Sequence, residues 1–142
     1  MEENKRLIIL DASVILKWFL WEKENLEEAK KIQEEFIARK INLIVPSHCF
    51  FELANTLKRK VPDDALNIIS KLKLSEIMEQ AINIKVISLA FKLMESHKKI
   101  SFYDAAYHAL ALAEDGIFVT ADENYYKITK GHRGIMLLKN YC

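Results

Sequence analysis

Glycine, proline and cysteine are scarce in this sequence. Its 142 residues include only three glycines, at 116, 131 and 134, together with two prolines and two cysteines. The GxGxxG pattern of dinucleotide-binding folds and the glycine-rich loop of P-loop proteins both need closely spaced glycines, so both classes are excluded. No stretch rich in Pro, Gly or Ser marks a linker, and we expect one domain over residues 1–142.

The two cysteines, Cys49 and Cys142, do not form a CxxC pair. Two thiols in a chain of this size are typical of a reduced intracellular protein, and Cys49 lies in an apolar run that predicts a core position. The opening MEENKR is charged, and no long apolar run follows it. We therefore expect no signal peptide, no membrane partner and a cytoplasmic location.

Neither sign of charge dominates. Lys and Arg number 21 against 20 Asp and Glu, so attraction to a polyanion would have to come from a local patch. About half of the residues are apolar, which is enough for a sizeable core without disulfides. The histidines lack HExxH spacing, and no Ser or Cys has the surroundings of a nucleophile elbow.

Short apolar runs alternate with longer amphipathic segments along the chain. This alternation predicts βαβ units and a parallel sheet, that is, an α/β fold. We expect strands at Arg6–Leu10, Asn42–Val45, Ile117–Thr120 and Ile135–Leu138. We expect helices at Ala12–Leu20, Leu26–Lys40, Ser47–Lys60 with Ser47 as its cap, Pro62 to about Leu72, Ile84–His97 and Ser101–Glu114, with a helical turn after Asp122.

Four acids occupy related places in this pattern. Asp11 and Asp122 follow predicted strands, at the edge where ligands bind to parallel sheets. Glu52 and Asp104 lie in helices that must pack on the same sheet. Each acid also has a simpler interpretation. Asp11, Asp104 and Asp122 could be helix caps, Asp104 through a capping box with Ser101. Glu52 could be an ordinary solvated helix residue.

Helix capping explains each acid separately, but it does not explain why all four converge. Four carboxylates at one edge repel one another unless cations lie among them. Hard oxygen ligands of this kind suit Mg²⁺ or Mn²⁺, which leave coordination positions open for phosphate. The acids therefore favour a divalent metal site.

Four segments together resemble the PIN domain and are most similar to VapC-type toxins: "LIILDASVILKW", "VPSHCFFELANTL", "SFYDAAYHALA" and "FVTADENYY". The resemblance runs from about Arg6 to Ile128, nearly the whole chain. It implies a single PIN-like domain with helices on both faces of a parallel sheet. It also implies an Mg²⁺- or Mn²⁺-dependent endoribonuclease with an RNA substrate, a cognate antitoxin partner and a homodimeric assembly.

The resemblance also assigns roles to residues. Asp11, Asp104 and Asp122 match the metal-binding acids, and Glu52 matches the helix acid that completes the site or holds the attacking water. Ser13 and Thr120 match hydroxyl positions beside these acids. A further acid or amide beyond the fourth acid has two candidates, Glu123 and Asn124.

Three further features have less specific interpretations. His108 lies one turn after Asp104 and could reach a phosphate, but we expect an exposed helix histidine. "KGHRG", Lys130–Gly134, is outwardly similar to the GXXG clamp of KH domains, and we expect a basic surface turn near the substrate. At least one ring among Trp18, Phe19 and Trp21 is expected on a surface that binds an amphipathic partner helix.

Three alternative functions stay open. A PIN-like nuclease could act in RNA maturation, outside toxin–antitoxin systems. A binding module could keep the fold without catalysis, although it would not need four acids. An aspartyl phosphotransferase or receiver-like fold also places an acid after its first strand, but the DxD pattern of such a phosphotransferase requires an Asp where Ser13 stands.

Overall fold

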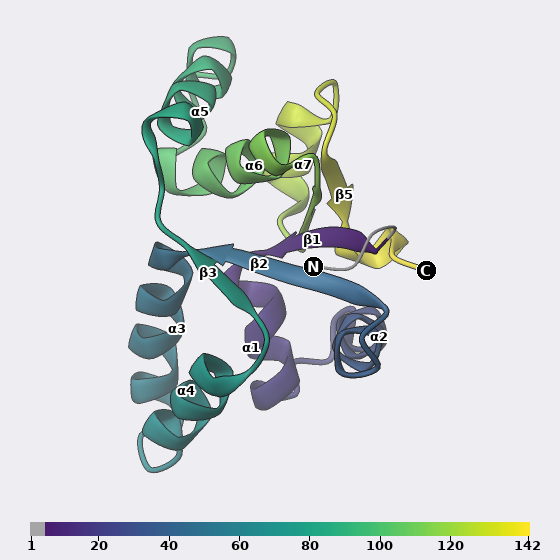
Figure 1. Ribbon diagram of the computed structural model, residues 1–142, viewed down its shortest axis with the longest axis vertical. Coiled ribbons are helices and arrows are strands. Elements are labelled where there is room, and N and C mark those ends of the chain that lie inside the picture. The colour runs from purple at the N-terminus through teal and green to yellow at the C-terminus, as the bar shows by residue number, and fades with distance from the viewer. Residues whose placement is uncertain (1–4) are drawn as a thin grey trace.

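The computed structural model describes residues 5–142, in which five strands form one parallel sheet (Figure 1). The strand order is β3-β2-β1-β4-β5, and every neighbouring pair is parallel. The strands are β1 (Arg6–Leu10), β2 (Ile41–Pro46), β3 (Met78–Gln80), β4 (Ile117–Thr120) and β5 (Ile135–Leu137). The predicted α/β fold with a parallel sheet is confirmed.

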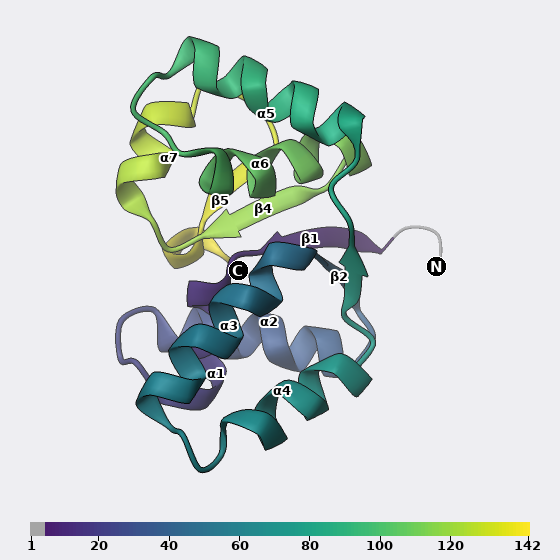
Figure 2. The same cartoon turned by 90° about the vertical axis from the view of Figure 1, so that its left-hand side faces the viewer.

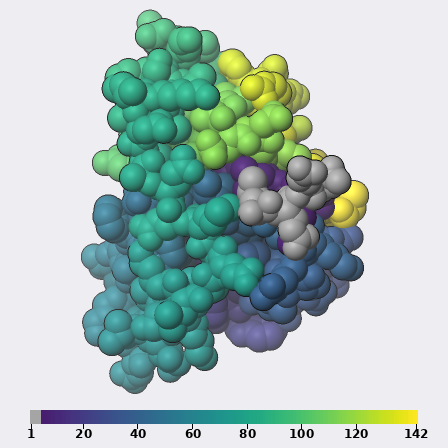
Figure 3. Space-filling model, in the orientation of Figure 1, coloured from purple at the N-terminus to yellow at the C-terminus, as the bar shows by residue number. Residues whose placement is uncertain are grey.

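Helices cover both faces of the sheet (Figures 1 and 2). One face carries α1 (Ala12–Leu20), α2 (Leu26–Ile37), α3 (Ser47–Lys60) and α4 (Ala65–Leu74). The other face carries α5 (Ile84–Ser96), α6 (Phe102–Glu114) and α7 (Glu123–Thr129), and a short 3-10 turn at Leu138–Asn140 follows β5. The segment from α4 through β3 to α5 crosses from one face to the other along one side of the molecule (Figure 3).

Strand β1 is the centre of the sheet and of the core. Ile8, Ile9 and Leu10 have no exposed surface, because helices cover β1 on both faces and β2 and β4 flank it. A strand buried on both faces has a continuous apolar sequence, and this is why the Arg6–Leu10 run predicted it correctly. Cys49 is fully buried, as its apolar run predicted.

Two predicted helix starts differ from the structure. Ser47 is the first residue of α3, and the N-cap is Pro46, so the predicted side-chain cap does not form. The helix expected from Pro62 begins instead at Ala65, after a turn, and ends at Leu74.

Strand β3 was not predicted. Its sequence, Met-Glu-Gln, contains one apolar residue, so it carries no hydrophobic signal. It lies at the edge of the sheet and is specified by backbone pairing with β2, from Ile44 opposite Met78 to Pro46 opposite Gln80.

The prediction of an exposed His108 is wrong. His108 is fully buried, its Nδ1 lies 3.0 Å from the Tyr125 hydroxyl, and its Nε2 lies 2.8 Å from the Arg133 carbonyl. Helix α6 lies between the sheet and α5 and α7 (Figure 1), so seven consecutive residues, Ala105–Ala111, are buried around the whole helix. Within residues 5–142, no helix has both the length and the apolar character needed to cross a bilayer.

The packing at Gly116 gives a test of this architecture. A Cβ atom there would lie 2.8 Å from the Leu7 carbonyl oxygen, in the central strand, and 2.8 Å from Ile9 Cδ1. We expect Gly116→Ala to lower the free energy of unfolding by about 1–3 kcal/mol, because the backbone of β1 cannot move away. Gly131→Ala is the matched control, since no atom lies within 4 Å of its added Cβ. Urea unfolding of both variants should separate them, and equal stabilities would contradict the packing.

Candidate active site

Asp11 lies where β1 ends and α1 begins, and hydrogen bonds reach both of its carboxylate oxygens. Oδ1 accepts from Ser13 Oγ at 2.5 Å and from the Val14 backbone nitrogen at 3.2 Å, and Oδ2 accepts from Thr120 Oγ1 at 2.9 Å. The bond to Val14 makes Asp11 the N-cap of α1. Donors from the first turn of α1 and from the end of β4 therefore fix the direction of this carboxylate.

Asp122 occupies the equivalent place after β4. Its Oδ1 accepts from the Tyr125 backbone nitrogen at 2.9 Å and caps α7. Its own backbone nitrogen donates to Thr120 Oγ1 at 3.0 Å. The Thr120 hydroxyl thus joins the Asp11 carboxylate to the backbone of Asp122.

Asp104 lies in the first turn of α6, where its backbone nitrogen donates to Ser101 Oγ at 3.1 Å. This is the bond expected between Ser101 and the third residue after it. Ser101 is therefore the N-cap of α6, as the spacing predicted.

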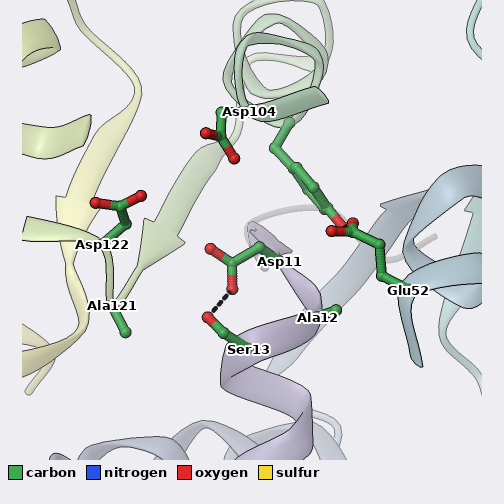
Figure 4. A pocket seen from close by; sticks show the side chains of 8 residues that line it. Asp11, Ala12, Ser13, Glu52, Asp104, Ala121 and Asp122 are labelled. Carbon is green, nitrogen blue, oxygen red and sulfur yellow. Dashed lines mark hydrogen bonds between the residues drawn. The ribbon is translucent and has the colours of Figure 1, made fainter. Parts of the chain in front are cut away.

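The four predicted acids line one pocket of about 370 Å³. Figure 4 shows the carboxyl groups of Asp11, Asp104 and Asp122 facing the same space from three different elements, with Glu52 at the side of α3. The remaining lining residues are Ala12, Ser13, Tyr107 and Ala121, so no Lys or Arg neutralises the acids from the pocket wall.

The pKa values of two of these acids reflect the crowding. Burial raises the pKa of Asp11, the hydroxyls of Ser13 and Thr120 oppose the rise, and Asp104 adds to it. Burial also raises the pKa of Asp104, and the charge of Asp122 is the second cause. Without a cation, the pocket therefore disfavours the charged forms of Asp11 and Asp104.

Glu52 is oriented by Tyr107, a residue that the sequence analysis did not single out. The Tyr107 hydroxyl donates to Glu52 Oε1 at 2.5 Å, and its ring stacks on Phe118 with centroids 5.5 Å apart. Burial raises the pKa of Tyr107, so the hydroxyl stays a donor. The available signal was its spacing, since position 107 shares a helical face with Asp104 three residues earlier.

The auxiliary candidates divide into two groups. Ser13 and Thr120 contact Asp11, as described above. Glu123 and Asn124 do not line the pocket, and Glu123 Oε1 instead accepts from Lys139 Nζ at 3.1 Å. The KGHRG turn also lies outside the pocket lining, and its His132 pairs with His97 at 2.9 Å between the Nε2 atoms.

The pocket has the donor chemistry of a divalent cation site, although the site is not preformed. Within residues 5–142, no three His, Cys, Asp or Glu side chains are already arranged to hold an ion. The three aspartates nevertheless offer hard oxygen donors from separate elements, with no competing cation in the pocket wall. A shared ion would offset the repulsion among these carboxylates, so the residues fit Mg²⁺ or Mn²⁺.

Comparisons with known proteins agree with this geometry. A family model for the PIN domain matches residues 8–131. No curated protein sequence matches the chain. Among solved structures, the chain is similar to a toxin–antitoxin complex from Klebsiella pneumoniae, with 17% identity, a TM-score of 0.71, and coverage of 92% of this chain and 97% of that one.

Two further solved structures are similar to the chain. The toxin VapC20 from Mycobacterium tuberculosis, described as cleaving the sarcin–ricin loop, is 16% identical with a TM-score of 0.66, covering 84% of this chain and 93% of that one. VapBC2 from Rickettsia felis, bound to promoter DNA, is also 16% identical with a TM-score of 0.66, covering 92% and 96%. At these identities the likeness shows the fold.

The raised pKa of Asp104 leads to a stability prediction for the protein in EDTA. A folded-state pKa above the unfolded value means that wild type loses stability as the pH rises through it, whereas the Asn side chain has no proton to lose and stays uncharged. Asp104→Asn should therefore melt above wild type at pH 7.5, and the gap should close below about pH 4, where the unfolded carboxyl is also protonated.

The control for this prediction is Asp63→Asn, in the exposed turn before α4. It should show no such pH-dependent gain, because Asp63 lies outside the pocket lining. Melting curves in EDTA across pH 3.5–8 test this prediction. A melting temperature of Asp104→Asn below that of wild type at pH 7.5 would contradict it.

Proposed function

Because the chain belongs to the PIN domain family, we propose that it is a divalent metal-dependent endoribonuclease and the toxin of a toxin–antitoxin pair. The observation that carries the proposal is the pocket at the carboxyl ends of β1 and β4, where four acids face one space with no Lys or Arg in the wall. A helix-capping role alone would not require this convergence.

Asp11, Asp104 and Asp122 are the proposed metal-binding residues. A bound Mg²⁺ or Mn²⁺ would neutralise the phosphate and lower the pKa of the attacking water. Asp11 holds the most fixed position, because Ser13 and Thr120 orient its carboxylate. Asp104 and Asp122 approach the same space from α6 and from the end of β4 (Figure 4).

Glu52 is proposed to hold the attacking water. The hydrogen bond from Tyr107 to Oε1 fixes the carboxylate and leaves Oε2 as an acceptor. A water bonded to Oε2 could pass its proton to this carboxylate as it attacks the phosphate. We propose that Tyr107 positions Glu52 and does not contact the substrate. Its hydroxyl donates to Glu52, one of the four acids.

The antitoxin partner is proposed from the kind of structures that share this fold, several of which are toxin–antitoxin complexes. Of the two tryptophans, Trp18 is 7% exposed and donates to the Ala29 carbonyl, so it packs inside. Trp21 is 62% exposed, with Lys30 Nζ 3.8 Å from its ring centroid. We therefore propose that the partner surface includes Trp21. The expected homodimer and the expectation of one domain over residues 1–142 remain predictions.

The principal prediction concerns RNA cleavage. Asp11→Asn and Asp104→Asn should each lower the cleavage rate at least about 100-fold, the scale on which lost stabilisation of transition-state charge is measured. Glu123→Gln is the matched control and should retain activity, because Glu123 points to Lys139 outside the pocket. Cleavage assays with purified protein and Mn²⁺ test this, and near-normal rates for both aspartate variants would remove the proposed site.

Metal binding gives an independent measurement. Millimolar Mn²⁺ should raise the wild-type melting temperature, since an ion a hundredfold above its Kd stabilises the folded state by about 2.7 kcal/mol. Asp11→Asn should lose most of this increase. An unchanged wild-type melting temperature would mean that the pocket acids do not bind the ion.

The toxin interpretation leads to a prediction about partner binding. The protein should co-purify with the product of an adjacent gene, and Trp21→Ala should weaken that complex about tenfold, the effect of losing an aromatic anchor worth roughly 1.4 kcal/mol. Ile84→Ala is the control, because Ile84 is also an exposed apolar residue but lies at the start of α5 on the other face. If no partner binds while RNA is still cleaved, the RNA-maturation alternative is favoured.

A further inference from the structure

Tyr103 is an exposed ring beside the acid pocket. It directly precedes Asp104 at the start of α6 and is 64% exposed. Another exposed ring, Phe51, also adjoins a pocket residue, but within residues 5–142 it makes no ring contact of the kind that fixes Tyr103. An aromatic ring left in water at the rim of a polar pocket needs an explanation, because burial would be favourable.

The ring of Tyr103 is held in place from two sides. Phe102 contacts it with centroids 6.3 Å apart, and His48 of α3 contacts it with centroids 6.0 Å apart, both near perpendicular. These contacts link α3 to α6 and limit the positions that the Tyr103 ring can take.

The same His48 connects Tyr103 to the acids. Its ring packs against Tyr107 with centroids 4.6 Å apart, and its Nε2 lies 4.0 Å from Glu52 Oε1. One imidazole therefore separates the exposed ring from the tyrosine and glutamate of the pocket wall. A group stacked on Tyr103 would lie next to the position where a phosphate meets the acids.

We propose that Tyr103 is a stacking platform for a nucleobase of the single-stranded RNA substrate, next to the cleaved phosphate. The inference rests on the proposed ribonuclease function and deepens it. Bases stack favourably on exposed aromatic rings, with little sequence preference, because every base has a π-face. A ring already fixed by His48 and Phe102 loses little entropy when the base arrives.

A second copy of the chain is the competing occupant of this ring. A symmetric contact over Tyr103 would bring two unneutralised acid pockets toward each other, at an electrostatic cost. A nucleobase is uncharged, and its phosphate would be drawn to a cation in the pocket. The charge of the acid pocket therefore favours a nucleobase on Tyr103.

The experiment measures RNA binding and RNA cleavage separately. Binding is followed by fluorescence anisotropy with a labelled single-stranded RNA in EDTA, and cleavage with Mn²⁺ gives KM and kcat. Tyr103→Ala should weaken binding and raise KM about tenfold, with kcat changed less than about threefold. Tyr103→Phe keeps the ring and should behave as wild type, whereas Phe91→Ala, an exposed ring on α5, should have no effect.

A scan with single abasic nucleotides identifies the stacked base. For wild type, one abasic position should weaken binding by the same factor as Tyr103→Ala, and Tyr103→Ala should be insensitive at that position. Wild-type binding by Tyr103→Ala, or equal sensitivity of both proteins at every position, would overturn the inference. The inference would also be overturned if Tyr103→Ala and Phe91→Ala lost RNA-binding affinity equally and sedimentation showed a changed oligomeric state. That result would identify Tyr103 as part of a protein interface.

The two proposals fail in different ways. If wild type cleaves no RNA with Mn²⁺, the ribonuclease function is wrong, and the anisotropy arm still reports whether Tyr103 contacts a base. If wild type cleaves RNA and Tyr103→Ala leaves both Kd and KM unchanged, only the stacking platform is wrong.

Discussion

The carboxylate of Asp11, placed at the end of the central strand, is the constraint on which the rest of this structure depends. Strand β1 is flanked by β2 and β4 and covered on both faces, so its end lies at the middle of the sheet edge. A charge there loses much of its hydration, which is costly without compensating bonds. Ser13, Val14 and Thr120 supply those bonds. They also fix the start of α1 and the relative positions of β1 and β4.

The capping and functional interpretations of the acids describe the same residues without conflict. Asp11 and Asp122 each cap a helix, and both still line the pocket. A carboxylate has two oxygens and about four acceptor positions, so one bond to a backbone nitrogen leaves the others available. A helix that begins directly after a parallel strand therefore holds its capping acid at the edge where ligands bind. Capping makes the acid more rigid, which suits a binding site.

A second layer of residues surrounds the acids and has a more apolar character. Tyr107 is buried against Phe118 and presents only its hydroxyl to Glu52. His48 fills the space between α3 and α6 beside it. An exposed helical glutamate would otherwise sample many rotamers, and this packing holds it at the pocket instead. The core and the candidate site thus share the same aromatic side chains.

The sequence by itself determined the strands that are apolar throughout, the parallel α/β fold and the four acids at one edge. These could be predicted because strand ends and helix starts are local features, and because parallel strands bring their carboxyl ends together. Tertiary structure alone decided that His108 is buried, that Met78–Gln80 forms a strand, that Tyr107 orients Glu52 and that Tyr103 stays exposed. Each of these depends on which distant element covers a given helical face or pairs with a given edge. Hydrophobic periodicity reports that a face is apolar, but it does not report what packs against it.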